Sequence, residues 1–197
     1  MTTLWLIRHG ETDWNVAGRL QGHREVPLNE NGLRQARALA ATLAKEPPFA
    51  ALYSSDLGRA KETAAAAAEV LGLPVTSRSE LRERNFGVLS DLTWVEAEAK
   101  HPELFSRLRV RDPDFVPAGG ESLSQTFART VTALNSIARE WPGAQVLVVT
   151  HGGVIDAAWR AANGVALHVK REFELHNASI HKLNWLETDH AVDGGPH

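Results

Sequence analysis

Apolar and polar positions alternate along this chain in a way that separates short buried strands from amphipathic helices. Apolar runs predict strands over 3–8, 50–54, 75–82, 145–150 and 180–185. Apolar residues at helical spacing predict five helices, over 29–46, 55–71, 94–108, 123–141 and 152–163. Within this pattern, Ser54-Ser55-Asp56 is expected to cap the second helix, and Pro102 is expected to interrupt the third.

Strands and helices take turns over most of the length, and this order is typical of an α/β fold. We therefore expect a single domain with a mainly parallel central sheet flanked by helices on both faces. The domain is expected to span residues 1–187, and the polar, Gly-rich residues 188–197 to form a disordered tail. A polar, Gly-containing segment at 10–28 predicts a long loop, and loops of that length are usually functional.

The composition excludes several classes of function. The 197 residues are 43% hydrophobic and 23% charged, which is typical of a globular domain. Without cysteine, thiolate chemistry and Cys-bound zinc are excluded. The five histidines in the last thirty residues match no metal-ligand spacing. A net charge of -3 without a basic run argues against nucleic acid as a partner. No apolar run approaches about 18 residues and no signal sequence is recognised, so we expect no membrane partner and a cytoplasmic location.

Two histidines occupy matching positions in the predicted sheet. His9-Gly10 follows the apolar strand at 3–8, and His151-Gly152 follows the strand at 145–150. The carboxyl ends of parallel strands meet at one edge of a sheet, where open α/β folds bind their ligands. If the two strands are neighbours, both imidazoles converge on one point.

The residues around His9 suggest phosphoryl chemistry. A neutral imidazole is a good nucleophile toward phosphorus. The forked donors of guanidinium groups match phosphate oxygens, and Arg8 and Arg59 are the candidates for that role. Arg59 lies early in a predicted helix, whose N-terminus would itself attract an anion. These arginines would supply the positive charge that a metal supplies in other phosphoryl-transfer enzymes.

Six motifs, in order along residues 3–180, resemble those of the histidine phosphatase superfamily, which includes cofactor-dependent phosphoglycerate mutases. The sequence Leu6-Ile7-Arg8-His9-Gly10-Glu11-Thr12 resembles the family signature. The other five are Asn15 with 18–22, the segment 53–64, Leu81-Arg82-Glu83 with Phe86-Gly87, 119–122 and 149–153. The resemblance implies a phosphoglycerate mutase-like fold.

The resemblance also assigns roles. His9 would carry the phosphoryl group, which Arg8, Arg59 and His151 would hold. Glu83 would donate a proton to the leaving oxygen and later activate water, although composition alone would place it in an exposed charge run. Further substrate contacts are expected from Asn15, Gln21, Gly22, Arg84 and Gly152. For Asn15, Gln21 and Gly22, turn chemistry is an equally good explanation without the resemblance.

Three functions remain open at this point. We favour a phosphohistidine-dependent, metal-independent phosphatase acting on a small phosphorylated metabolite, with no cofactor. A phosphoglycerate mutase is the alternative, and it would need 2,3-bisphosphoglycerate; residues 84–120 are few for the insertion found in glycolytic mutases. A non-catalytic phosphate-binding module is disfavoured, because His9, Arg59, Glu83 and His151 are all present. The oligomeric state stays open, with a homodimer as one option.

Overall fold

Strand β1 (Thr2–Arg8) lies inside a five-stranded sheet in a computed structural model that describes residues 1–186. The strand order is β3-β2-β4-β1-β5. The other strands are β2 (Ala51–Ser55), β3 (Val75–Arg78), β4 (Gln145–Thr150) and β5 (Ile180–Trp185). All neighbours pair in parallel except β5, which runs antiparallel to β1. The mainly parallel sheet is therefore confirmed.

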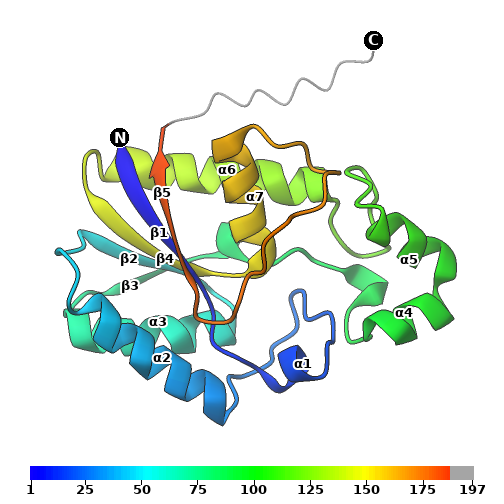
Figure 1. Ribbon diagram of the computed structural model, residues 1–197, viewed down its shortest axis with the longest axis horizontal. Coiled ribbons are helices and arrows are strands. Elements are labelled where there is room, and N and C mark those ends of the chain that lie inside the picture. The colour runs from blue at the N-terminus through cyan, green and yellow to red at the C-terminus, as the bar shows by residue number, and fades with distance from the viewer. Residues whose placement is uncertain (187–197) are drawn as a thin grey trace.

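Two helical layers cover the sheet, and the alternation of side chains along β1 explains why (Figure 1). Leu4 and Leu6 pack on one face against α6 (Leu123–Glu140) and α7 (Gly152–Asn163). Trp5 and Ile7 pack on the other face against α2 (Glu30–Leu43) and α3 (Gly58–Leu71). Since both faces bury apolar residues, β1 is apolar throughout its middle rather than alternating.

A smaller unit lies to one side of these layers (Figure 1). It contains α4 (Trp94–Lys100) and α5 (Pro102–Arg109), which are separated at His101 because proline has no N–H to continue the first helix. The predicted interruption at Pro102 is thus confirmed. The unit has its own apolar cluster, which includes Leu89, Phe105 and Phe115.

Three local predictions were wrong in detail. The segment 10–28 contains the short helix α1 (Asp13–Val16), because the hydroxyl of Thr12 and the side chain of Asn15 form a capping box. Helix α3 is preceded by Leu57 without a side-chain cap, since Ser54 and Ser55 continue β2 in register with β3. The strand expected over 75–82 ends at Arg78 and gives way to the 3₁₀ helix Ser79–Leu81; a second 3₁₀ helix spans Gly87–Leu89.

The tail predicted at 188–197 lies outside the described residues. Within residues 1–186, no helix combines the length and the apolar character needed to cross a membrane.

Candidate active site

The two strand-end histidines meet because β1 and β4 are direct neighbours. In the parallel register Arg8 lies opposite Thr150, so His9 and His151 follow at the same edge of the sheet. The backbone N–H of His9 donates to the carbonyl of Thr150 over 3.0 Å. The two ring centroids are 5.1 Å apart. The predicted convergence of the two imidazoles is confirmed.

His9 is arranged as a neutral imidazole with one ring nitrogen available. Its ring is buried, and its Nδ1 lies 2.7 Å from the carbonyl oxygen of Gly10. Since a carbonyl oxygen only accepts hydrogen bonds, Nδ1 carries the proton. Burial, followed by the positive charges of Arg59 and Arg8, holds the pKa of His9 well below its ordinary value. The lone pair of Nε2 is therefore available to attack an electrophile.

Arg8 and Arg59 supply positive charge beside this ring. The Arg59 side chain is almost fully buried and donates to the carbonyls of Gly22 and Arg24 at 2.8 and 2.9 Å. Burial lowers the pKa of Arg59 to about 10, so it stays charged at neutral pH. Arg8 donates to the carbonyl of Leu175.

Buried side-chain nitrogens without hydrogen-bond partners gather in this cluster. Among the described residues, the Nε atoms of Arg8 and Arg59 and the Nδ1 atom of His151 are buried without a hydrogen bond. Burying such groups unpaired costs free energy, so a site that collects three of them is suited to bind an acceptor. A phosphoryl group offers several acceptor oxygens and negative charge together.

His151 is fixed by a residue that the sequence analysis assigned to a helix cap. Its Nε2 is 2.8 Å from the hydroxyl of Ser55, at the end of β2. This contact exists because β2 is the other neighbour of β4. Burial and then the charge of Arg59 hold the pKa of His151 well below its ordinary value, so the ring is neutral in the empty site.

Glu83 lies on the irregular segment between the two 3₁₀ helices, beside the N-terminus of α7. The backbone N–H of Gly153 lies 3.1 Å from both carboxylate oxygens, and that of Arg84 donates to Oε1 over 2.8 Å. A Cβ at position 153 would lie 2.1 Å from Oε1 of Glu83, so the carboxylate can hold this position only beside glycine. The carboxylate is thus held at the N-terminus of helix α7, by the amide two residues after the N-cap His151.

Some residues expected to contact substrate lie in the loop after β1, and the others line a cleft. The carboxamide oxygens of Asn15 and Gln21 both lie 3.0 Å from the hydroxyl of Thr12, so they shape the loop after β1. Gly22, with a positive φ of 50°, presents its carbonyl to Arg59. Their roles in substrate binding stay predictions, as do those of Arg84 and Gly152, which line the cleft described below.

At the N-terminus of α3, the first backbone amide of the helix is already occupied. The N–H of Gly58 donates to the carboxylate of Glu25 over 2.9 Å, so the chain supplies its own anion there. Arg59 still reaches the site because its side chain, rather than the helix end, faces the loop that contains Gly22.

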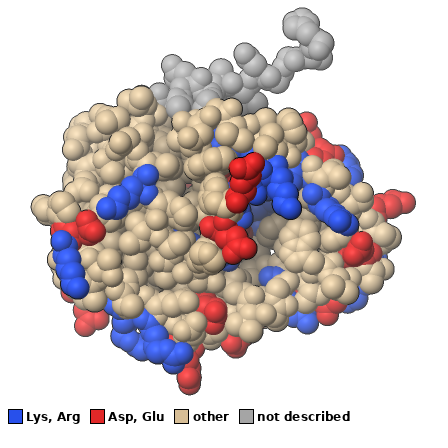
Figure 2. Space-filling model, in the orientation of Figure 1, with Lys and Arg blue, Asp and Glu red and all other residues tan. Residues whose placement is uncertain are grey.

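A cleft of about 920 Å³ opens beside the histidines. Arg8 and Glu83 connect this cleft to the cluster around His9, since both line the cleft and both interact electrostatically with Arg59. Figure 2 shows Lys and Arg side chains around a hollow between the body of the molecule and the α4–α5 unit. Two carboxylates, Glu83 and Asp156, and six cationic side chains line the cleft, the latter being Arg8, Arg84, Arg109, Arg111, Lys170 and Arg171.

Asp156, on α7, pairs with several of the arginines near the cleft. It was not among the site residues predicted from the sequence. Its buried carboxylate accepts from Arg111 at 2.8 Å, Arg160 at 3.0 Å and Arg171 at 3.3 Å. One carboxylate therefore faces three guanidinium groups. Arg111 has a positive φ of 56°, because it directly follows the C-cap of α5, where a left-handed residue commonly ends a helix. Only the Asp156–Arg160 spacing of i, i+4 was visible in the sequence.

No group of three or more His, Cys, Asp or Glu side chains among residues 1–186 could hold a metal ion. Arg59 and Arg8 place positive charge beside His9.

Known proteins resemble this chain along nearly its whole length. The model of the histidine phosphatase superfamily (branch 1) matches residues 4–194. A metal-independent phosphoserine phosphatase from Arabidopsis thaliana is 47% identical, over 98% of this chain and 80% of the relative. Phosphoglycerate mutase-like protein 4 from the same plant is 38% identical over 93% and 80%. The structure of a mycobacterial glucosyl-3-phosphoglycerate phosphatase superimposes with a TM-score of 0.81 at 33% identity, covering 91% of this chain and 90% of that one.

Proposed function

The chain belongs to the histidine phosphatase superfamily, and on that premise we propose that it hydrolyses small phosphate monoesters through a phosphorylated His9. The observation that carries the proposal is the neutral His9 ring with a free Nε2, beside the unpartnered buried Nε donors of Arg8 and Arg59 and the unpartnered Nδ1 of His151. Such a cluster offers a nucleophile and a binding site for the equatorial phosphoryl oxygens at one place.

The reaction proceeds in two steps. Nε2 of His9 attacks phosphorus, the bond from phosphorus to the ester oxygen breaks, and Glu83, as the general acid, gives a proton to that oxygen. Water then attacks the phosphohistidine while Glu83 takes a proton back, and inorganic phosphate leaves. Arg8, Arg59 and His151 bind the transferred group in both steps.

The test is an assay of the purified protein against a panel of phosphate monoesters, alongside His9→Ala. We expect inorganic phosphate release and an acid-labile phosphoenzyme, both lost in the variant. Hydrolysis that survives in His9→Ala would refute the mechanism.

A phosphoglycerate mutase is the second candidate, favoured by the mutase-like relative. A mutase must exclude water from its phosphohistidine. One arm of the panel therefore contains 3-phosphoglycerate with 2,3-bisphosphoglycerate. Isomerisation there that is much faster than hydrolysis of every other substrate would favour the mutase.

The preferred monoesters carry a second anionic group. The phosphoryl group uses Arg8 and Arg59, and this leaves Arg111 and Arg171 in the cleft with only one shared carboxylate. A substrate carboxylate would balance that excess. The names of two relatives are consistent with this, since phosphoserine and glucosyl-3-phosphoglycerate both contain a carboxylate.

Phosphoserine and phosphoethanolamine make a matched pair, because they differ only by that carboxylate. We expect phosphoserine to have the higher kcat/KM by roughly 10-fold to 100-fold, in line with about 1.5–3 kcal/mol for a charge-assisted hydrogen bond. Arg111→Met should remove most of that preference by raising KM for phosphoserine alone. Equal loss on both substrates would argue against a carboxylate subsite.

A further inference from the structure

Glu83 lies in a segment whose own backbone hydrogen bonds do not fix its position. The residues around it form neither a helix nor a strand, so no regular hydrogen-bond ladder holds their backbone. General acid catalysis requires the carboxyl within hydrogen-bond reach of the leaving oxygen. A displacement of about 1 Å can lower the rate by a factor of about a hundred. Something outside the segment must therefore hold it.

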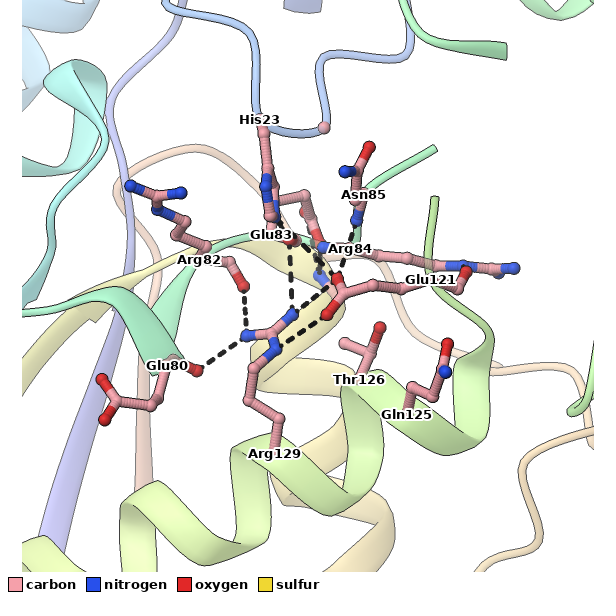
Figure 3. A network of polar contacts seen from close by, with 12 residues as sticks. His23, Glu80, Arg82, Glu83, Arg84, Asn85, Glu121, Gln125, Thr126 and Arg129 are labelled. Atoms are coloured by element: carbon pink, nitrogen blue, oxygen red, sulfur yellow. Dashed lines mark hydrogen bonds and ion pairs between the residues drawn. The ribbon is translucent and has the colours of Figure 1, made fainter. Parts of the chain in front are cut away.

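Arg129, on α6, bonds this segment through its backbone (Figure 3). One terminal nitrogen of its guanidinium donates to the carbonyls of Glu80 and Arg82 at 2.7 and 2.9 Å. The other lies 3.5 Å from the carbonyl of Glu83. Three carbonyls in a span of four residues thus converge on one side chain.

Glu121 completes the arrangement by fixing Arg129 and the following residues. Its carboxylate accepts from Nε and a terminal nitrogen of Arg129 at 3.0 and 2.9 Å, a bidentate pair (Figure 3). The same carboxylate accepts the backbone N–H of Asn85 over 3.0 Å, and the carbonyl of Glu121 accepts from Nε of Arg84. Burial alone would raise the pKa of Glu121, but the hydrogen bonds from Arg129 and Asn85 hold it below its ordinary value.

A contact from the loop after β1 joins the same point. Nε2 of His23 donates to the carbonyl of Glu83 over 2.8 Å. His23 lies between Gly22 and Arg24, whose carbonyls hold Arg59. One short loop, residues 22–24, therefore contacts both the backbone of Glu83 and the side chain of Arg59.

We propose that the Arg129–Glu121 ion pair, defined here as the clamp, is a positioning device for the acid–base group Glu83. The clamp bonds the backbone of the segment, and the residues that line the cleft in the described chain do not include Arg129. It therefore acts on where the carboxyl lies, and it does not contact substrate. The proposal rests on the proposed function, in which Glu83 protonates the leaving oxygen.

The experiment uses the leaving group to report on proton donation. A dinitrophenolate leaves without a proton, whereas an alkoxide requires one. Rates of phosphoenzyme formation are measured by rapid quench with 2,4-dinitrophenyl phosphate and with an alkyl phosphate such as phosphoserine. For Arg129→Met we expect a loss of roughly 10-fold to 100-fold on the alkyl ester. With the dinitrophenyl ester the loss should stay below about threefold, and KM should change little on either substrate.

Two further variants and a control sharpen the result. Glu121→Gln, which keeps the shape of the side chain, should give the same pattern more weakly, and it serves if Arg129→Met does not fold. Arg129→Ala should be partly rescued by added guanidinium on the alkyl ester only. Arg78→Met is the matched control, because Arg78 also pairs with α6, through Glu140 at 2.6 Å, yet bonds no carbonyl of the 80–85 segment. It should leave both rates unchanged.

The possible failures are distinct. Equal losses on both esters in Arg129→Met and Glu121→Gln would mean that the clamp only stabilises the fold, which overturns the proposal. If Glu83→Gln itself affects both esters equally, the acid role in the proposed function fails instead. Retained alkyl-ester activity in Arg129→Met with a strong loss in Glu83→Gln would overturn the clamp alone.

Discussion

The proposed role of His9 as nucleophile rests on one hydrogen bond and two charges. The bond from Nδ1 to the Gly10 carbonyl selects the tautomer, and burial beside Arg59 and Arg8 disfavours a second proton. In the empty site, the charges of Arg59 and Arg8 help to lower the pKa of His9. A bound anion would balance these charges. Phosphate binding should therefore raise the pKa values of His9 and His151.

Ring ¹⁵N spectra of the labelled protein test these charge states. At about pH 6, below the ordinary histidine pKa of about 6.5, we expect His9 and His151 to remain neutral. Their signals are assigned from His9→Gln and His151→Gln. Saturating inorganic phosphate should shift at least one ring toward the protonated form. A ring half-protonated near pH 6.5 in the empty site would contradict the lowered pKa values.

Gly153 offers a second test at the scale of one atom. A methyl group at this position would meet Oε1 of Glu83 at 2.1 Å, whereas at Gly152 the nearest atoms lie at 3.8 Å or more. Gly153→Ala should push the carboxylate away and lower kcat by roughly 100-fold, the effect of a misplacement of about 1 Å. Gly152→Ala should lose far less. Similar kcat values for the two variants would show that the carboxylate adapts freely.

Helix α6 both packs on the sheet and holds a segment of the site. Val131, Leu134 and Ile137 pack on the sheet, while Arg129 on the same helix holds the Glu83 segment. The helix begins after Ser122, whose hydroxyl accepts the N–H of Gln125 over 3.0 Å in a capping box. The position of the first turn, and of Glu121 just before it, depends on this cap.

Removing the cap should weaken the domain measurably. Ser122→Ala is expected to cost about 1 kcal/mol of unfolding free energy and to lower Tm by roughly 2–4 °C. Urea titration and a thermal scan measure both. Ser136→Ala, in the middle of the same helix, should stay within about 0.5 kcal/mol. Equal stability of the two variants would mean that the cap does not limit unfolding.

The stability of the whole molecule should depend on pH through its buried histidines. His9 and His151 have lowered pKa values in the folded state, so below about pH 6.5 the unfolded chain binds more protons than the folded one. Unfolding free energy should therefore fall on acidification, by up to about 1.4 kcal/mol per pH unit for each ring. Carboxylates with lowered pKa values, such as Asp156, add their loss only at lower pH.

Urea titrations at several values between about pH 7 and pH 5 measure this slope. The double variant His9→Gln/His151→Gln should flatten it, because neither glutamine titrates. An unchanged slope in the double variant would assign the pH dependence to other groups.

Much of the architecture followed from local pattern. Because β1 and β4 are buried on both faces, their apolar runs were visible, and the cap at Ser122 and the break at Pro102 were encoded within a few residues. The helix cap predicted at Ser54-Ser55-Asp56 failed because β-pairing with β3 extends the strand over both serines. A competing long-range interaction overrode a local preference.

What the sequence determined by itself was the set of chemical groups and their place at strand ends. His9, Arg8 and His151 could be located because each follows or ends an apolar run. Arg59 was a candidate from its place early in a predicted helix, and the family resemblance identified Glu83. Tertiary structure decided how these groups are held and charged. The contacts of Ser55 with His151, of Asp156 with Arg111 and of Arg129 with Arg82 join residues 96, 45 and 47 positions apart. Burial, which sets the charge of both histidines, likewise arises only when strands and loops from the whole chain pack together.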